Sequence, residues 1–240
     1  MDRDEIVIVG AARTAIGGFQ GELKDKSAPE LGAAAIAAAL SRAGLPAAEV
    51  GEVFMGCVLP AGLGQAPARQ ASIFAGVPQS VPCTTINKMC GSGMKAMMLG
   101  HDLIAAGSLD TVVAGGMESM TNAPYLLPKA RGGFRLGHGE VKDHMFLDGL
   151  EDAYDKGRLM GTFAEDTAQA FQFTRKAQDA FAIESLRRAQ KATADGSFAA
   201  EIVKVVGKTK ALIDSTGAGD PIVEGLQRRG DMRVEGYTFT

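Results

Sequence analysis

The first 116 residues alternate between strand-like and helix-like stretches, and this alternation constrains the fold more than any other feature of the chain. The strand-like stretches are apolar and rich in β-branched residues, whereas the stretches between them have helical periodicity. The expected strands cover residues 5–11, 52–59, 83–89 and 111–116, and the expected helices cover residues 27–45, 64–77 and 90–109. Such alternation is typical of an α/β domain with a mainly parallel sheet and right-handed crossovers.

The helix expected at 27–45 has the clearest boundary signals. Ser27 belongs to the residue types that cap helices, and Pro29 falls in the first turn, where its missing N–H group costs nothing. Gly44 is the residue expected to end this helix.

The sequence changes character after Gly116. Residues 117–161 contain turn residues and scattered charges without a clear period, which indicates an excursion from the sheet, and such irregular stretches commonly carry function. A helix is expected over residues 174–196 and a strand over 201–206. The apolar face predicted for this helix contains Ala177, Phe181, Ile183 and Leu186.

Charge and hydrophobicity exclude several classes of partner. The formal net charge is −3, so no overall basic field attracts nucleic acid or an anionic membrane. The first ten residues lack the features of a signal peptide, and no apolar run approaches the roughly 20 residues of a membrane helix. We therefore expect a cytoplasmic protein with neither a nucleic-acid nor a membrane partner.

The chain has three cysteines, Cys57, Cys83 and Cys90, without a CxxC pair. No histidine is spaced to join them, so we expect neither a disulfide scaffold nor a metal site. Cys57 and Cys83 fall in or next to apolar strands and are interpreted as core residues.

Cys90 differs from the other two because it stands where a strand-like stretch passes into a helix. If the helix begins at about Cys90, its unpaired N–H groups and its dipole favour the thiolate, which is the nucleophilic form. Gly91 and Gly93 leave room beside the sulfur for a substrate. The alternative is that Cys90 is a small buried apolar residue. The nearby methionines are interpreted as core packing rather than as a ligand-binding face: Met89, Met94, Met97 and Met98.

Longer motifs around Cys90 resemble one family. "NKMCGSGMKAMMLG" is followed by "DTVVAGGMESMTNAPY", then by "MGTFAED" and by "QDAFAIESLRRAQKA…GSFAAEIVKV". Their order and spacing are similar to those of the biosynthetic thiolases, the acetyl-CoA acetyltransferases, of the thiolase superfamily. The resemblance runs from "GAARTAIGGFQG" to about Val206, which is most of the chain.

The resemblance implies a fold and an activity. The fold is a thiolase-like half-fold of the α/β class, with an N-terminal α/β domain at 1–116 and an inserted loop domain with an atypical tail at 117–240. Cys90 matches the nucleophile that carries the acyl group. It would take an acyl group from acyl-CoA and pass it to a second acetyl-CoA in a Claisen condensation, or run the reverse thiolysis, as part of fatty acid metabolism.

The resemblance also implies a binding site for acyl-CoA, which is a substrate, so no cofactor is expected. Leu159, Met160 and Gly161 match the acyl pocket, although many members have a histidine where this chain has Leu159. Four tail cations are candidates for contact with the CoA phosphates, with a solvated surface as the alternative: Lys208, Lys210, Arg228 and Arg229.

Three further groups of the family's chemistry do not occur in these 240 residues. They are a histidine in a GHP-type turn, a second cysteine in a CxGGG-type loop and an asparagine in an NEAFA-type segment. His101 lies 11 residues along the expected helix from Cys90, about 16 Å away, and cannot substitute. His138 and His144 are interpreted as solvated loop histidines. We therefore expect the nucleophile-bearing half of a thiolase, without turnover by this chain alone, in a homo-oligomer (dimer or tetramer) or with a partner.

Three other functions are alternatives to this one. A non-catalytic thiolase-like domain that binds CoA or assembles with a partner is the main alternative, because the histidine and the second cysteine are missing. A ketosynthase-type enzyme is disfavoured by "GGMESM" and by the loop-domain helix. The segment "DSTGAGD" at 214–220 is similar to the anion-hole motif of ribokinase-like sugar kinases, but a turn is the simpler interpretation of so short a match.

Overall fold

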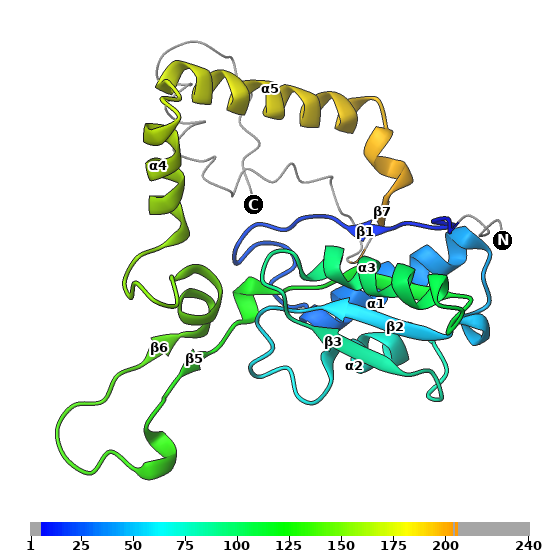
Figure 1. The fold of residues 1–240 in the computed structure, drawn as a ribbon, viewed down its shortest axis with the longest axis horizontal. Helices are drawn as coiled ribbons and strands as arrows, with labels where there is room; N and C mark the ends of the chain where they lie inside the picture. The colour runs from blue at the N-terminus through cyan, green and yellow to red at the C-terminus, as the bar shows by residue number, and fades with distance from the viewer. Residues whose placement is uncertain (1–5, 204, 206–240) are drawn as a thin grey trace.

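Figure 1 shows a computed structural model of the chain, which describes residues 6–203 and residue 205. At its centre lies a parallel sheet of three strands in the order β3-β2-β4. The strands are β2 Glu52–Gly56, β3 Cys83–Ile86 and β4 Val112–Gly116. Gly56 is level with Ile86 on one side and with Gly116 on the other, so the three carboxyl ends meet at one edge. The expected α/β class with a parallel sheet is confirmed.

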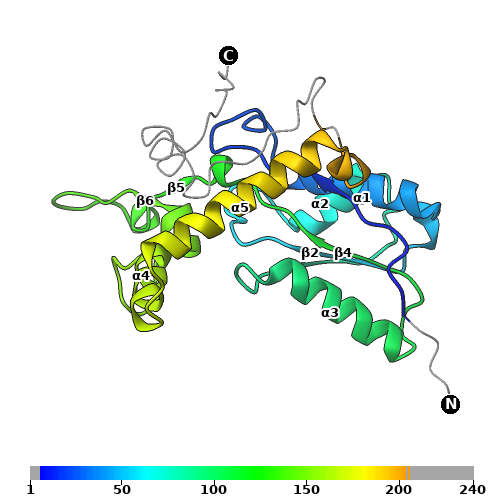
Figure 2. The same ribbon diagram turned by 90° about the horizontal axis from the view of Figure 1, so that it is seen from above.

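Helices cover both faces of this sheet, as Figure 2 shows. One face carries α1 Ala28–Ala43 and α2 Pro67–Phe74, and the other carries α3 Ser92–Ala105. Apolar side chains of α1, α2 and β2 fill the space between them and form the core, among them Ile36, Leu40, Val53, Met55, Ala68 and Ala71. Each fully buried large side chain contributes about 1.5–3 kcal/mol, so this layer supplies most of the hydrophobic stabilisation.

The boundary signals of α1 act as predicted. Ser27 is the N-cap, and its side chain accepts the N–H of Glu30 while Glu30 accepts the N–H of Ser27, which forms a capping box. Gly44 ends the helix with φ +63°, a conformation that glycine adopts without strain.

The strand predicted at 5–11 is wrong. Residues 6–12 belong to no strand, and β1 Arg13–Thr14 pairs instead with β7 Ile202–Val203. Gly10 lies so close to α1 that a Cβ there would be 2.6 Å from the Ala39 carbonyl oxygen. An apolar β-branched run becomes a strand only where a neighbouring strand offers hydrogen bonds, and within the described residues none lies beside this segment.

The excursion predicted after β4 is present, but it is more regular than expected. Its elements up to α4 are η2 Met120–Asn122, β5 Tyr125–Leu126, η3 Ala130–Gly132, β6 Lys142–Asp143, the π-helix η4 Phe146–Leu150 and α4 Met160–Ala170. β5 and β6 form a short antiparallel pair. The helix α4 was not predicted, because it has neither a capping side chain nor a buried apolar stripe that would reveal it.

The predicted helix at 174–196 is confirmed as α5 Arg175–Ala194, followed by η5 Ser197–Ala200. Thr174 caps α5 by accepting the N–H of Ala177 at 3.1 Å. No residue of α5 is buried, and Phe181 on its predicted apolar face is 79% exposed. Figure 1 shows α4 and α5 as an arch that leaves the sheet region and returns to it at β7.

No helix within the described residues is long and apolar enough to cross a bilayer. The four tail cations proposed as phosphate contacts and the segment 214–220 lie outside the described residues.

Candidate functional site

Cys90 lies in the turn that joins β3 to α3. β3 ends at Ile86, which is level with the last residues of β2 and β4, so this turn stands at the carboxyl edge of the sheet. The chain leaves the sheet for the excursion at the same edge, directly after Gly116. In parallel α/β sheets this edge is where ligands usually bind.

Hydrogen bonds between residues close in sequence hold residues 87–92, which we call the Cys90 turn. The N–H of Met89 donates to Asn87 Oδ1 at 3.0 Å, and the N–H of Gly91 donates to the Lys88 carbonyl at 3.1 Å. Met89 has φ +50°, a conformation that costs a residue with a side chain about 1 kcal/mol or more. The surrounding contacts therefore hold the residue before Cys90 in a strained conformation.

Ser92 closes the Cys90 turn from beneath and is 4% exposed. Its hydroxyl donates to the Met89 carbonyl at 2.6 Å and accepts the N–H of Lys88 at 2.9 Å. A Cβ on Gly56 would lie 2.6 Å from the Ser92 Cβ, so the glycine at the end of β2 lets α3 start close to the sheet. The sequence motif "CGSG" contains this serine, but only the structure shows that it lies against Gly56.

The helix α3 begins at Ser92 and not at Cys90, with Gly91 as its N-cap. The tight turn includes Cys90 and Gly91, the two residues before the helix. Cys90 therefore lies just outside the first helical turn. Cys90 is exposed, so its interpretation as a buried apolar residue is wrong. Within the described residues no side chain forms a hydrogen bond with its sulfur.

Cys57 and Cys83 are in the environment predicted for core residues, though to different degrees. Cys57 is 1% exposed, whereas Cys83 is half-buried and donates to the Val81 carbonyl at 3.4 Å. Burial, together with the charge of Glu118 and a hydrogen bond to it, raises the pKa of the Cys57 thiol to about 12. Cys57 is therefore an unreactive thiol, unlike the exposed Cys90.

The methionines of α3 do not pack in the core, so that prediction is wrong. Met94, Met97 and Met98 are 71%, 48% and 52% exposed. Met94 and Met98 lie on the face of α3 opposite the sheet and Met97 on its flank, because the buried residues Ala96 and Gly100 face the strands.

His144 is not a solvated loop histidine, which corrects the prediction; it is 5% exposed. Its Nδ1 lies 2.6 Å from Asp148 Oδ2, and the N–H of Ala61 donates to its Nε2 at 3.4 Å. His144 therefore ties the excursion to the loop after β2. His101 and His138 are both exposed, as expected of solvated side chains.

The residues predicted for the acyl pocket lie at the start of α4. Leu159 is the N-cap in an extended conformation, and Met160 and Gly161 are the first two helical residues. Leu159 lines a cavity of about 300 Å³ together with Lys142, Asp143, Phe146, Leu147, Glu151 and Gly157. Met160 is 49% exposed and, like Gly161 and Cys90, does not line this cavity.

Arg158 fixes the start of α4. Its guanidinium lies 3.9 Å from the centre of the Phe163 ring and forms an ion pair with Asp166. It also donates to the Thr162 hydroxyl at 3.2 Å. The position of Leu159 thus depends on the charged residue before it, a dependence that the sequence did not indicate.

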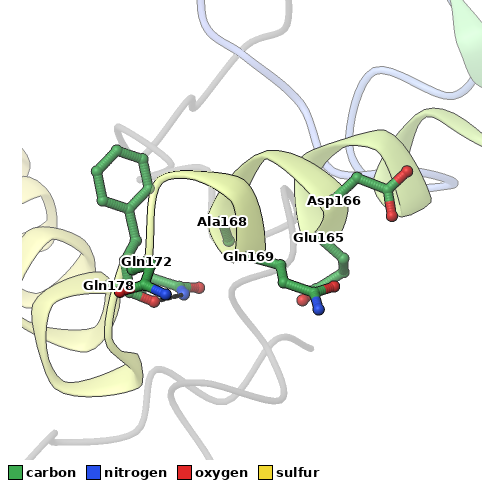
Figure 3. Close-up of a pocket in the computed structure, with 7 residues that line it drawn as sticks. Glu165, Asp166, Ala168, Gln169, Gln172 and Gln178 are labelled. Carbon is green, nitrogen blue, oxygen red and sulfur yellow. Dashed lines mark hydrogen bonds between the residues drawn. The ribbon is translucent and has the colours of Figure 1, made fainter.

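A second cavity, of about 420 Å³, lies where α4 meets α5 (Figure 3). It is lined by Glu165, Asp166, Ala168, Gln169, Gln172, Phe173 and Gln178. In Figure 3 the side chains of Glu165 and Gln169 lie next to each other, whereas Asp166 points away from them. The Glu165 carboxylate disfavours an anionic ligand in this cavity, whereas Asp166 is paired with Arg158. Neither Cys90 nor Leu159 lines the cavity.

No group of three or more histidine, cysteine, aspartate or glutamate side chains arranged to hold a metal ion occurs within residues 6–203 and 205. The candidate site therefore consists of the exposed thiol of Cys90, the turn that holds it and the excursion that starts at the same edge. An exposed thiol before a helix is suited to nucleophilic chemistry.

Comparison with known proteins identifies the family. The family described as "Thiolase, N-terminal domain" matches residues 6–224. The acetyl-CoA acetyltransferase of Cupriavidus necator is 52% identical over 202 residues, which are 84% of this chain and 51% of that protein. Acetyl-CoA acetyltransferase 2 of Arabidopsis thaliana is 53% identical over 202 residues, 84% of this chain and 50% of its own length.

Among solved structures, the Acat5 thiolase from Ascaris suum in complex with coenzyme A has a similar fold. The TM-score is 0.79 with 43% sequence identity, over 82% of this chain and 51% of that chain. The chain spans about half the length of the curated relatives that it matches. By the extent of the family match and by these identities, the chain belongs to the thiolase family, of which it matches the N-terminal domain.

Proposed function

We propose that this chain carries the nucleophile-bearing half of a thiolase-type acyltransferase, with Cys90 as the catalytic residue. The observation that carries the proposal is the exposed thiol of Cys90, held at the carboxyl edge of the sheet by a strained turn. The names of the relatives, acetyl-CoA acetyltransferases, support acetyl-CoA as the acyl donor. The proposed whole reaction is the condensation of two acetyl-CoA to acetoacetyl-CoA, or the reverse thiolysis.

The step assigned to this chain is transfer of the acyl group to the sulfur. The Cys90 thiolate attacks the thioester carbonyl carbon, and a new C–S bond forms as the carbonyl electrons move to oxygen. When the carbonyl re-forms, the bond to CoA sulfur breaks, and the CoA thiolate leaves and takes up a proton. The N–H groups of Ser92 and Lys95 in the first turn of α3 donate to the Met89 and Gly91 carbonyls. Those of Gly93 and Met94 remain to stabilise the negative charge that develops.

The second step needs groups that these 240 residues do not contain. In a Claisen condensation the α-carbon of a second acetyl-CoA loses a proton and attacks the acyl-cysteine, which releases the Cys90 thiolate. The family motifs for the histidine, the second cysteine and the asparagine are not in this sequence. We therefore propose acyl transfer to Cys90 by this chain, with condensation dependent on residues from elsewhere.

The excursion is proposed as the loop domain that covers CoA, beginning at residue 117, with residues 1–116 as the α/β domain. The solved relative in complex with coenzyme A supports CoA as the ligand. Leu159, Met160 and Gly161 are proposed to line the acyl pocket. Leu159, with Phe146 and Leu147, would give this pocket an apolar side, opposite in character to the Lys142, Asp143 and Glu151 that also line the cavity.

A homo-oligomer and a cytoplasmic location are part of the proposal, as is a role in fatty acid metabolism. The exposed methionine face of α3 supports association with another chain. Three free cysteines fit a reducing compartment such as the cytoplasm. Sedimentation of the purified chain tests the association, because a monomer at all concentrations would contradict it.

A second candidate is a domain that binds CoA without chemistry. It is favoured by the observation that Cys90 lines neither of the two cavities described above. In that case CoA would bind with no acyl group transferred to the sulfur.

Mass spectrometry separates the two functions. The 240-residue chain is incubated with acetyl-CoA, and we expect an acetyl adduct that is lost in Cys90→Ala and kept in the matched control Cys83→Ala. The adduct without acetoacetyl-CoA would identify a half-enzyme. Binding of CoA without any adduct would contradict the acyltransferase and support the binding domain.

A further inference from the structure

The loop after β2, residues 57–61, connects the Cys90 turn to Glu118. Glu118 stands two residues beyond β4, and the N–H of Met117 before it donates to the Gly56 carbonyl at 2.9 Å. The side chain of Glu118 therefore projects from the end of one strand toward the loop that leaves the neighbouring strand.

The carboxylate of Glu118 holds this loop through both of its oxygens. Oε2 accepts the N–H of Val58 at 2.8 Å, and Oε1 accepts the N–H of Leu59 at 3.0 Å. The Cys57 sulfur lies 3.6 Å from Oε1 as a weaker donor. Hydrogen bonds to a charged acceptor are about twice as strong as neutral ones, so this loop is held tightly.

The side chain of Asn87 links this loop to the Cys90 turn. Asn87 donates from Nδ2 to the Val58 carbonyl at 3.3 Å, and its Oδ1 accepts the N–H of Met89 at 3.0 Å. Met89 is the strained residue directly before Cys90. Strain of this kind persists only where neighbouring groups hold the backbone in place.

The far end of the same loop is also fixed. The N–H of Ala61 donates to His144 Nε2 at 3.4 Å, and His144 in turn contacts Asp148. A loop held at Val58, Leu59 and Ala61 is a rigid support for the amide of Asn87.

We propose that Glu118 is a positioning residue for Cys90, acting through Val58 and Asn87 without touching the thiol. The expected effect of Glu118 on catalysis rests on the proposed function of Cys90. The mechanical coupling from Glu118 to the Cys90 turn is a property of the described contacts and is tested separately.

Amide hydrogen exchange in the full chain tests the coupling. Glu118→Gln keeps the size of the side chain but offers one acceptor oxygen in place of two, so one of the Val58 and Leu59 N–H groups faces an NH₂ donor. We expect exchange at Met89, Gly91 and Ser92 to become at least about tenfold faster, which corresponds to about 1.4 kcal/mol. The amides of Ile36 and Leu40 in α1 should not change.

The matched control is Glu52→Gln at the opposite end of β2, where Glu52 accepts the Thr84 hydroxyl at 3.1 Å. It should leave exchange in the Cys90 turn unchanged. Asn87→Ala removes the link itself from an exposed position, so it should accelerate the same three amides without a loss of folding. The coupling is overturned if Asn87→Ala or Glu118→Gln leaves these amides within twofold of the unaltered chain.

The catalytic consequence has its own measurement. In Glu118→Gln the maximal rate of Cys90 acetylation should fall at least about tenfold, with the half-saturating acetyl-CoA concentration unchanged, because Glu118 is not proposed to touch CoA. An unaltered maximal rate would overturn the positioning role. A chain that forms no adduct without any substitution would contradict the proposed function, while the exchange experiment would still decide whether Glu118 holds the turn.

Discussion

Residues 6–116 and residues 117–203 form similar amounts of regular structure by different means. In the first region the helices α1, α2 and α3 each bury side chains against the sheet. In the second, Met117 and His144 are the only buried residues among those the structure describes, and neither α4 nor α5 has one. The helices of the sheet region are therefore stabilised by packing, whereas those of the excursion depend on local contacts.

The local contacts of α5 are charged pairs one turn apart. They are Arg175 with Asp179, Glu184 with Arg188 and Lys191 with Asp195. Pairs at this spacing on a helix contribute about 0.2–0.5 kcal/mol each; two of the three are exposed, whereas the Asp179 side chain is 17% exposed. Such a sum is small beside the burial of one large side chain in the core, so α5 should open at a lower free energy than α1.

Hydrogen bonds join the two regions near both ends of the second one. Arg42 of α1 donates to the Ala11, Glu201 and Ile202 carbonyls at 2.9, 2.9 and 3.4 Å, and Arg13 pairs with Glu201 at 2.9 Å. At the other end Glu118 holds the loop after β2, and His144 accepts the N–H of Ala61. Ser119 and Asn122 also donate to the Lys26 carbonyl, and Thr121 accepts the N–H of Gln20.

The largest expected difference is between two phenylalanines. Phe54 in β2 is 5% exposed and Phe181 in α5 is 79% exposed. Phe54→Ala should lower the free energy of unfolding by about 3–5 kcal/mol, because it leaves a cavity in the packed layer. Phe181→Ala should change it by less than about 0.5 kcal/mol. Urea unfolding measures both, and equal effects would refute the contrast between the regions.

The next difference is between two thiols. Iodoacetamide should modify Cys57 at least about a hundredfold more slowly than Cys90 at pH 8, because the raised pKa of Cys57 leaves almost no thiolate. Peptide mapping of the folded chain gives both rates. Comparable rates would mean that the loop after β2 opens readily.

The same thiol predicts how stability depends on pH. The pKa of Cys57 is about 12 in the folded chain against an ordinary value of 9.0. The unfolded chain therefore loses this proton first, so the contribution to stability is complete below about pH 9 and is lost as the pH rises toward 12. Cys57→Ala should flatten the decline in unfolding free energy between about pH 9 and 11. An unchanged slope would contradict the prediction.

Two glycines give a smaller contrast. Gly56→Ala should cost about 1–3 kcal/mol, because the new Cβ would lie 2.6 Å from the Ser92 Cβ and push α3 from the sheet. Gly161→Ala in α4 meets no atom within 4 Å and should leave stability unchanged within about 0.5 kcal/mol. Thermal unfolding distinguishes them, and a neutral Gly56→Ala would show that α3 is not tightly seated.

The smallest contrast is between two helix caps. Ser27→Ala should cost about 1 kcal/mol of global stability, because α1 belongs to the core and unfolds with it. Thr174→Ala removes the same kind of cap from α5 and should speed amide exchange only in its first turn. A global loss from Thr174→Ala would show that α5 unfolds together with the sheet.

Much of the sheet region was predictable because each element signals itself locally. The cap at Ser27, the stop at Gly44 and the apolar runs of β2, β3 and β4 depend only on neighbouring residues. The segment 5–11 has the same apolar pattern, but the strand predicted there does not form. A strand also needs a neighbouring strand, which its own residues do not specify. The helix α4 was missed for the opposite reason, because nothing local marks its start.

The candidate site shows the same division. The sequence by itself determined that Cys90 follows a strand, precedes a helix and stands among small residues, because chain order and side-chain chemistry are local properties. Only the tertiary structure decided that Gly56 lies against Ser92 in the turn that carries Cys90, and that Glu118 is linked to this turn through Val58 and Asn87. These residues come from a helix start, a strand end and loops, and hydrogen bonds and close contacts between them exist only once the sheet has brought its carboxyl ends together.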